Sequence, residues 1–197
     1  MHAFEKDWRG FYPAANPVGW MMRNACAKHY VRFHSLPLSK QYADTDAERQ
    51  IILHRQNTLL DEVLGEGRPF WLTETTTEAS LEQYPNLHAL TTWPKYKFEP
   101  ALRFLEEEGD PEYEQAWTTY ASRQTWKAGA FDDLLWAVAD EKATYILWMA
   151  PLTGAVFAPY DGGVDLFLPT SDLVEELKIK HHDWLPIYPK LPNDSSC

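Results

Sequence analysis

The part of the sequence that most restricts the fold is the C-terminal third, where short apolar runs alternate with turn signals. Residues 144–149, 156–158 and 164–168 are each typical of a strand. A Pro-Leu-Thr-Gly turn at 151–154 separates the first two runs, and Asp-Gly-Gly at 161–163 separates the second from the third. Because such short turns join antiparallel neighbours, we predict an antiparallel three-strand unit here.

The clearest helix signal lies nearer the N-terminus. Thr45-x-x-Glu48 has the spacing of a capping box, in which each side chain satisfies the free amide of the other residue. Apolar side chains then recur at helical intervals. The pattern predicts a helix that runs to about Leu64 and stops at Gly65.

Three further segments show helical signals. Residues 17–27 follow an Asn-Pro start, and residues 131–138 carry apolar side chains on one helical face. Residues 171–185 do the same after a cap at Thr170 or Ser171. We predict a helix in each segment.

Other segments favour strands through alternation or through β-branched and aromatic residues. They are residues 29–34, 68–77, 87–98 and 120–127. Residues 101–105 are predicted to form a helical turn.

Together these elements predict an α+β fold, with a mostly antiparallel sheet and helices packed against it. The sequence has no fixed-period repeat and no Gly/Ser linker, so we predict a single domain over residues 1–190 and a flexible tail at 191–197. The alternative is a two-lobe arrangement hinged near residues 99–114.

The charge of the chain indicates which classes of partner it can bind. The 197 residues include 18 Lys and Arg against 29 Asp and Glu, a formal net charge of −11. A nucleic-acid partner needs clustered cations, so none is expected. Residues 99–114 carry seven acidic residues against Arg103 alone, a local charge of −6, which would steer a cationic partner.

Processing signals point to a cytoplasmic protein. The only cysteines are Cys26 and Cys197, so no disulfide framework is expected. The N-terminal residues mix both charge signs and favour no signal peptide. The apolar stretch at 143–157 is interrupted by Pro151 and Gly154 and is shorter than a bilayer span, so we expect no membrane partner.

Nucleophile and cofactor motifs are missing from the sequence. It contains no Gly-x-Ser-x-Gly elbow, no glycine-rich nucleotide loop and no His-Glu-x-x-His helix. We therefore predict no catalytic residue, no metal and no cofactor, although an enzyme whose residues meet only in the fold would escape this search.

One candidate ligand site gathers polar and ionisable groups at a predicted strand end and the loop after it. Its residues are Arg32, His34, Ser35, Lys40 and Tyr42. Alternation would put Arg32 and His34 on the same face of the strand, where they would bind an anion. The competing interpretation is a solvated strand face.

Two groups of acidic and histidine residues allow a metal interpretation. Asp161 and Asp165 beside two glycines would hold a cation, but turn formation explains them better. His181, His182 and Asp183 are consecutive and cannot converge on one ion while the helix is regular. We interpret His181 as a core histidine and the other two as solvent-facing.

The tryptophans favour a partner surface. Six of them exceed what one core of this size readily hides, and tryptophan suits a buried contact with a partner. These six are Trp71, Trp93, Trp117, Trp126, Trp136 and Trp148. The candidate partner-binding residues are Trp93, Glu106, Glu107, Glu108 and Trp117. The competing interpretation is that most of the rings fill the interior.

The C-terminal motifs resemble those of a family of small bacterial proteins of unknown function. The resemblance rests on Tyr145–Trp148, Gly154–Phe157, Tyr160–Leu166 and a helix that closes on Asp183–Leu185, about the last seventy residues. It implies an architecture and a bacterial origin, and it assigns no catalytic residue. Small acidic α+β proteins of similar style include immunity proteins that neutralise basic toxin domains.

The leading hypothesis is a non-enzymatic, immunity-like bacterial protein that captures a basic protein partner through an acidic, aromatic surface. The alternative is a small-molecule enzyme or ligand-binding protein with an anion site near Arg32, His34 and Lys40. A third possibility is a structural or oligomerisation module.

Overall fold

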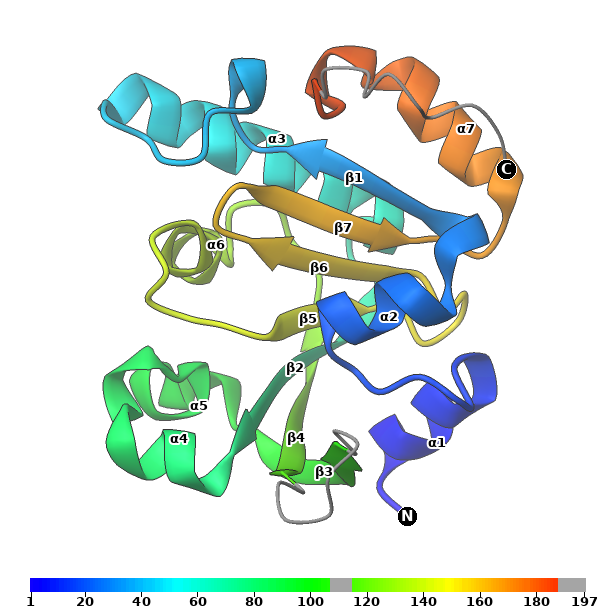
Figure 1. The fold of residues 1–197 in the computed structure, drawn as a ribbon, viewed down its shortest axis with the longest axis vertical. Coiled ribbons are helices and arrows are strands. Elements are labelled where there is room, and N and C mark those ends of the chain that lie inside the picture. The colour runs from blue at the N-terminus through cyan, green and yellow to red at the C-terminus, as the bar shows by residue number, and fades with distance from the viewer. Residues whose placement is uncertain (107–114, 188–197) are drawn as a thin grey trace.

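A computed structural model describes residues 1–106 and 115–187. Seven strands in these ranges form one sheet in the order β1-β7-β6-β5-β2-β4-β3, with each adjacent pair antiparallel (Figure 1). Helices pack on both faces, so the predicted α+β class with an antiparallel sheet is confirmed. None of the helices in these ranges combines the length and apolar character needed to cross a membrane.

The strands are β1 (Tyr30–His34), β2 (Pro69–Thr77), β3 (Glu99–Glu106), β4 (Gln115–Thr125), β5 (Ile146–Met149), β6 (Val156–Tyr160) and β7 (Gly163–Phe167). The α-helices are α1 (Ala3–Phe11), α2 (Gly19–Ala25), α3 (Asp46–Leu64), α4 (Glu78–Gln83), α5 (Ala89–Thr92), α6 (Asp132–Ala139) and α7 (Ser171–Lys180). Short 3₁₀ turns cover Ala27–His29, Pro37–Ser39, Pro85–Leu87, Pro94–Tyr96 and His182–Trp184.

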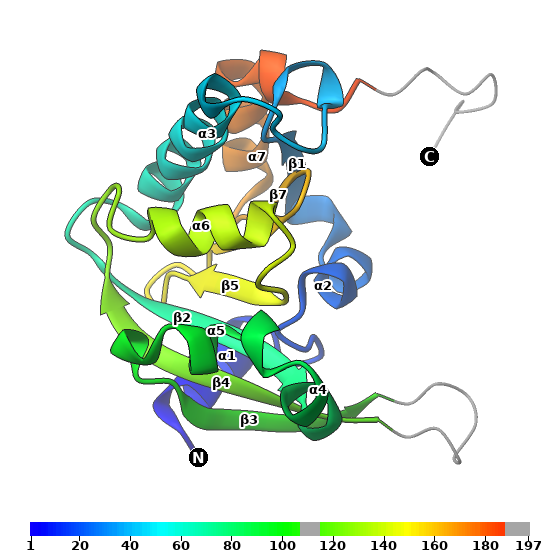
Figure 2. The same cartoon turned by 90° about the vertical axis from the view of Figure 1, so that its left-hand side faces the viewer.

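Helices lie on both faces of the sheet (Figure 2), and each face has an apolar layer beneath them. The larger layer packs α3, α6 and α7 on one face, and the smaller one packs α1 and α2 on the other. Strand β2 shows why both apolar layers are needed. Its Phe70 and Leu72 side chains point into the larger layer, and its Trp71 side chain points into the smaller one. Since alternate side chains of a strand face opposite ways, a strand buried on both faces reads as continuously apolar.

The capping box is present as predicted. The Thr45 hydroxyl accepts a hydrogen bond from the Glu48 amide at 3.2 Å, and a Glu48 carboxylate oxygen accepts from the Thr45 amide at 3.2 Å. Helix α3 then runs to Leu64 and ends at Gly65, whose φ of 80° suits glycine. The sequence prediction of this helix is confirmed at both ends.

The C-terminal unit is also confirmed. Strands β5, β6 and β7 are antiparallel neighbours, and Thr170 caps α7 through the Leu173 amide at 3.3 Å. The predicted helix over 171–185 ends earlier, at Lys180, and a separate 3₁₀ turn follows. The predicted tail at 191–197 lies outside the described residues.

Two local predictions are wrong. Residues 87–98 form short helical turns begun by Pro85 and Pro94, whose fixed φ suits the first position of a turn. Residues 101–105 lie in β3, where pairing with β4 overrides the helical propensity of the segment. The strand predicted to start at residue 120 begins earlier, at Gln115.

Helix α1 was not predicted from the sequence. Its apolar signal is the pair Phe4 and Trp8, which are four residues apart and fully buried against β2. A pair this short, on a helix of nine residues, does not stand out until the sheet supplies the surface that it covers.

Candidate functional site

The candidate site is a pocket at the place where two adjacent strands separate. Strands β5 and β6 pair only at Trp148–Phe157 and Met149–Val156. Before that point β5 pairs with β2 alone, and beyond it β6 pairs with β7 alone. Pro159 lies in this single-sided part of β6, where its missing amide costs no bond to β5.

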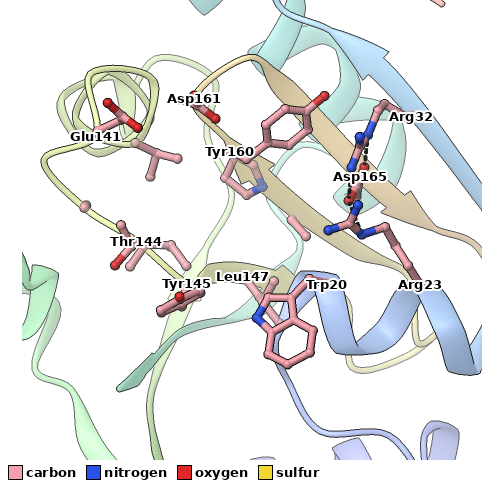
Figure 3. A pocket seen from close by; sticks show the side chains of 16 residues that line it. Trp20, Arg23, Arg32, Glu141, Thr144, Tyr145, Leu147, Tyr160, Asp161 and Asp165 are labelled. Carbon is pink, nitrogen blue, oxygen red and sulfur yellow. Dashed lines mark hydrogen bonds and ion pairs between the residues drawn. The ribbon is translucent and has the colours of Figure 1, made fainter. Parts of the chain in front are cut away.

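The opening between the strands encloses about 380 Å³. Helix α2 borders it with Gly19, Trp20 and Arg23, and the segment after α6 borders it with Glu141 and Thr144 (Figure 3). This volume is within the range of small-molecule sites.

Backbone conformation at the pocket wall is unusual. Glu141 and Tyr145 have φ angles of 55° and 54°, a region that residues other than glycine rarely adopt. Both belong to the connection between α6 and β5 and both line the pocket. Such strain is concentrated at ligand sites, which supports this pocket as the functional one.

A charge cluster forms one side of the pocket. Asp165 on β7 accepts two hydrogen bonds from Arg32 on β1, at 2.7 and 2.9 Å from Nε and Nη2. Its second oxygen also lies 3.4 Å from Arg23 Nε. The cluster carries two guanidinium groups against one carboxylate, so it keeps a net positive charge.

Tyr30 completes this cluster, donating its hydroxyl to Asp165 at 3.0 Å. Burial raises the pKa of Tyr30, and the Asp165 charge raises it further. Burial works to lower the pKa of Arg32, but the hydrogen bond and charge of Asp165 outweigh that effect and raise it. The hydroxyl therefore stays protonated and the guanidinium stays charged throughout the physiological range.

The opposite side of the pocket is acidic. Figure 3 shows Asp161 and Glu141 across the opening from Arg23 and Arg32. Asp161 accepts hydrogen bonds from the Tyr42 hydroxyl, at 3.2 Å, and from the Gln41 amide. The pocket thus separates a net positive side from a side with two carboxylates.

Aromatic rings line the space between the charged sides. Trp20 and Tyr145 are 40% and 42% exposed, which leaves a large part of each ring free for contact. The Tyr160 ring lies under the Arg32 guanidinium at 4.6 Å, a cation–π distance.

The structure brings only part of the predicted anion cluster to this pocket. Arg32 lines it. Ser35 is buried and accepts from the Gln56 side chain at 3.0 Å, and Lys40 pairs with Asp44 and Glu48 on the surface. His34 and Tyr42 do not line the pocket, although Tyr42 donates its hydroxyl to Asp161, which does.

His34 yields a test of electrostatics near the pocket. Burial lowers the pKa of His34, and the charge of Arg32 lowers it further. The unfolded chain therefore binds a proton more readily, so acidification below about pH 6.5 favours unfolding. We expect the urea midpoint of the wild type to fall more between pH 7.5 and 5.5 than that of His34→Gln. Equal falls in the two proteins would contradict the lowered pKa.

Among the candidate partner-binding residues that the structure describes, Trp117 is buried, and Trp93 and Glu106 are partly buried. Trp117 is 7% exposed and donates its indole N–H to Glu106 at 2.8 Å, and Trp93 packs at the edge of the larger apolar layer. Glu107 and Glu108 lie outside the described residues. Trp71, Trp126 and Trp148 are also buried, so most of the tryptophans fill the interior.

The residues considered for metal binding have other partners. Asp165 is held by arginines and Asp161 by Gln41 and Tyr42. His181 is a buried histidine bonded to Glu62 at 2.9 Å, as the sequence indicated, while His182 and Asp183 are exposed. Within the part of the chain that the structure describes, no three metal-ligating side chains come together.

Sequence reasoning did not identify Trp20, Arg23, Glu141 or Tyr145 as site residues. Arg23 and Trp20 are three residues apart on α2, so they share a helix face, and that was the one local signal. The pocket residues on β5, β6 and β7 lie more than a hundred residues away from Trp20 and Arg23 in the chain. Only the sheet order brings them together.

The fold and the pocket define an α+β protein with a mixed-charge pocket at a split in an antiparallel sheet. The chain belongs to the family that shares a domain of unknown function (DUF3885), whose profile matches residues 18–189. The match extends far beyond the last seventy residues that carried the resemblance. No curated protein and no solved structure matches the chain.

Proposed function

We propose that this protein is a ligand-binding protein whose pocket holds a small zwitterionic molecule, of the size of an aromatic amino acid. The observation that carries this proposal is the separation of charge across the pocket. Arg23 and Arg32 outnumber Asp165 on one side, and Asp161 and Glu141 lie on the other. A carboxylate fits the first side and an ammonium group fits the second.

The rings explain why an aromatic ligand is favoured. Trp20 and Tyr145 present exposed faces at the pocket, and an apolar side chain placed between them loses contact with water. Arg32 is already committed to Asp165 through two hydrogen bonds, so Arg23 is the cation best able to bind a ligand carboxylate.

The proposal is tested with phenylalanine and tyrosine as probes, measured by thermal shift and isothermal titration. Phenethylamine and phenylpropionate, which each lack one charge, are the matched probes. We expect the amino acids to raise the melting temperature and the single-charge compounds to do so much less. If none of the four compounds changes the melting temperature, the proposal is contradicted.

Arg23→Gln is expected to weaken binding of the amino acid roughly 10- to 100-fold, because a hydrogen-bonded charge contact is worth about 1.5–3 kcal/mol. The Arg23 side chain is 40% exposed, so stability is expected to change little. Arg49→Gln, at another surface-exposed arginine, is the control and should bind like wild type. Unchanged affinity in Arg23→Gln would place the carboxylate elsewhere.

A second candidate is an immunity-like bacterial cytoplasmic protein that captures a basic protein. The observation that favours it is a row of aromatic contacts from the pocket to the acidic segment. Tyr145 meets Trp117 at 5.5 Å, Trp117 stacks on Phe104 at 6.4 Å, and the Trp117 indole bonds to Glu106. With the net charge of −11, this edge of the sheet suits a cationic surface.

A pull-down from the native host separates the two candidates. A variant with lysine at Glu106, Glu107 and Glu108 serves as the control, and Arg23→Gln serves as the pocket variant. Basic-partner capture predicts a protein that the wild type and Arg23→Gln retain and the lysine variant loses. Recovery of no partner by any of the three forms would contradict it.

A further inference from the structure

A second group of reactive side chains lies away from the pocket, beside strand β2. Glu74 follows Phe70 and Leu72 on the face covered by the larger apolar layer. Ser80 belongs to α4, and His88 immediately precedes α5. The two helices lie beside β2 (Figure 1), which brings residues 74, 80 and 88 together.

The three side chains form a continuous hydrogen-bonded chain. His88 Nδ1 lies 2.8 Å from Glu74 Oε1, and His88 Nε2 lies 3.2 Å from Ser80 Oγ. The second Glu74 oxygen accepts the Leu90 amide at 2.8 Å, so the carboxylate is fixed at both atoms. In serine hydrolases, the nucleophile, the base and the carboxylate that orients the base are connected in the same way as Ser80, His88 and Glu74.

The hydrogen bonds set the tautomer of the imidazole. Because a carboxylate only accepts, Nδ1 carries the proton and donates it to Glu74. In the neutral imidazole, the lone pair of Nε2 then faces the Ser80 hydroxyl 3.2 Å away, which donates to it. This is the arrangement in which a histidine removes a proton from a serine.

Burial supports a role beyond packing. Glu74 and His88 are 0% and 3% exposed, while Ser80 is half-buried and reaches the surface. Burying an ionisable pair is costly, and apolar residues of similar size would fill the same space without that cost. The hydrogen bond that His88 donates to Glu74 raises the pKa of His88, as a carboxylate partner does for a catalytic base.

The exposed residues near Ser80 in the chain include two large apolar side chains. Tyr84 and Leu87, in the segment that joins Ser80 to His88, are 50% and 38% exposed. They offer contact to the apolar part of a substrate. The residues named here do not line the pocket between β5 and β6.

We propose that Ser80, His88 and Glu74 form a hydrolytic triad that cleaves small esters. Ser80 Oγ attacks the ester carbonyl carbon, its proton passes to His88 Nε2, and the carbonyl electron pair moves onto oxygen. When the carbonyl re-forms, the bond to the alkoxy group breaks and that group leaves as an alcohol with the proton from His88. Water then releases the acid from Ser80 by the same route, so ester and water give acid and alcohol.

The sequence motif search missed this group because it looks for a fixed local pattern. Ser80 has no glycine on either side at the elbow positions, and the chain order Glu74, Ser80, His88 differs from the order that goes with that elbow, in which the acid follows the serine. Only the return of the chain through residues 85–88 places His88 against Ser80 and Glu74. Triads are recognised by geometry and not by sequence position.

Diisopropyl fluorophosphate tests the proposal directly on the full chain. Attack by Ser80 forms an oxygen–phosphorus bond, expels fluoride and passes the proton to His88. We expect one adduct by intact mass, located on Ser80 by peptide mapping, and none in Ser80→Ala. Ser171→Ala, at an exposed serine that starts α7, is the matched control and should label like wild type.

Two measurements keep a structural role apart from a catalytic one. The labelling rate should rise with pH and level off, with a midpoint above the ordinary histidine value of about 6.5. His88→Gln should label at least about 100-fold more slowly, as expected for loss of a general base. The circular dichroism spectrum of this variant shows whether it has folded.

Ser80→Ala leaves the buried pair of Glu74 and His88 intact. Loss of p-nitrophenyl acetate hydrolysis in this folded variant supports the triad. Wild-type protein that stays unlabelled overturns the proposal, as does labelling that does not change with pH.

Discussion

Asp165→Asn is expected to lower the free energy of unfolding by about 3–5 kcal/mol, since removing one partner of a buried charge pair leaves the other uncompensated. Asp165 is 3% exposed and is bonded to Arg32 and Tyr30, with Arg23 close by. The substitution keeps the shape of the side chain, but its amide would point a donor at guanidinium groups that only donate. Urea unfolding at pH 7 measures the change.

The matched control for this variant is Asp46→Asn. The Asp46 side chain is 98% exposed and pairs with Arg49 only at 3.8 Å, so its loss should change stability by less than about 1 kcal/mol. Adding 0.5 M salt should not reproduce the Asp165→Asn effect, because buried pairs are screened weakly. If the free energy of unfolding of Asp165→Asn lies within about 0.5 kcal/mol of the wild-type value, the charge cluster does not stabilise the β1–β7 pair.

Gly163→Ala is expected to destabilise the protein by about 2–3 kcal/mol or more. A Cβ atom at residue 163 would lie 2.1 Å from the Phe33 carbonyl oxygen and 2.9 Å from the Tyr160 hydroxyl. The first of these is a backbone atom of β1 and cannot turn aside as a side chain can. The strands β1 and β7 would have to move apart, which would also shift the Tyr160 ring that lines the pocket.

Gly10→Ala provides the comparison for this prediction. Nothing lies within 4 Å of a Cβ built at Gly10, which is near the end of α1. Alanine there should be neutral or stabilise by up to about 1 kcal/mol, because glycine is the poorer helix former. Melting temperatures of the two variants should therefore differ by roughly 6–15 °C in a protein of this size. Equal melting temperatures would show that the close approach at residue 163 is readily relaxed.

The two predictions concern the same region of the sheet. Asp165 and Gly163 both lie on β7, which is paired with β1 on one side and β6 on the other. The close β1–β7 contact brings Phe33 and His34 of β1 against Gly163 of β7. The cross-strand pair of Arg32 and Asp165 holds the two strands in register. Strand β1 carries Arg32 to the pocket, and β6, which pairs with β7, carries Tyr160.

Local patterns were enough for many of the elements. The capping box at Thr45 and Glu48 satisfies its amides within one turn, and the turns at 151–154 and 161–163 need only their own residues. Signals of this kind survive in any tertiary context because their interactions span a few residues. Residues 87–98 also had a local signal, because Pro85 and Pro94 begin their turns, but we interpreted the segment as a strand. Residues 101–105 had no such signal, so pairing with β4 decided their structure.

The sequence by itself determined the α+β class, the antiparallel C-terminal unit, the long capped helix and the acidic charge. It also pointed to Arg32, but neither to its partners nor to residues 74, 80 and 88 as a group. Only the tertiary structure decided that β5 leaves β6 after two pairs and that α2 lies over the opening. The reason is physical: strand pairing joins residues such as Arg32 and Asp165 that are 133 positions apart. Spacing along the chain carries no information about contacts at that separation.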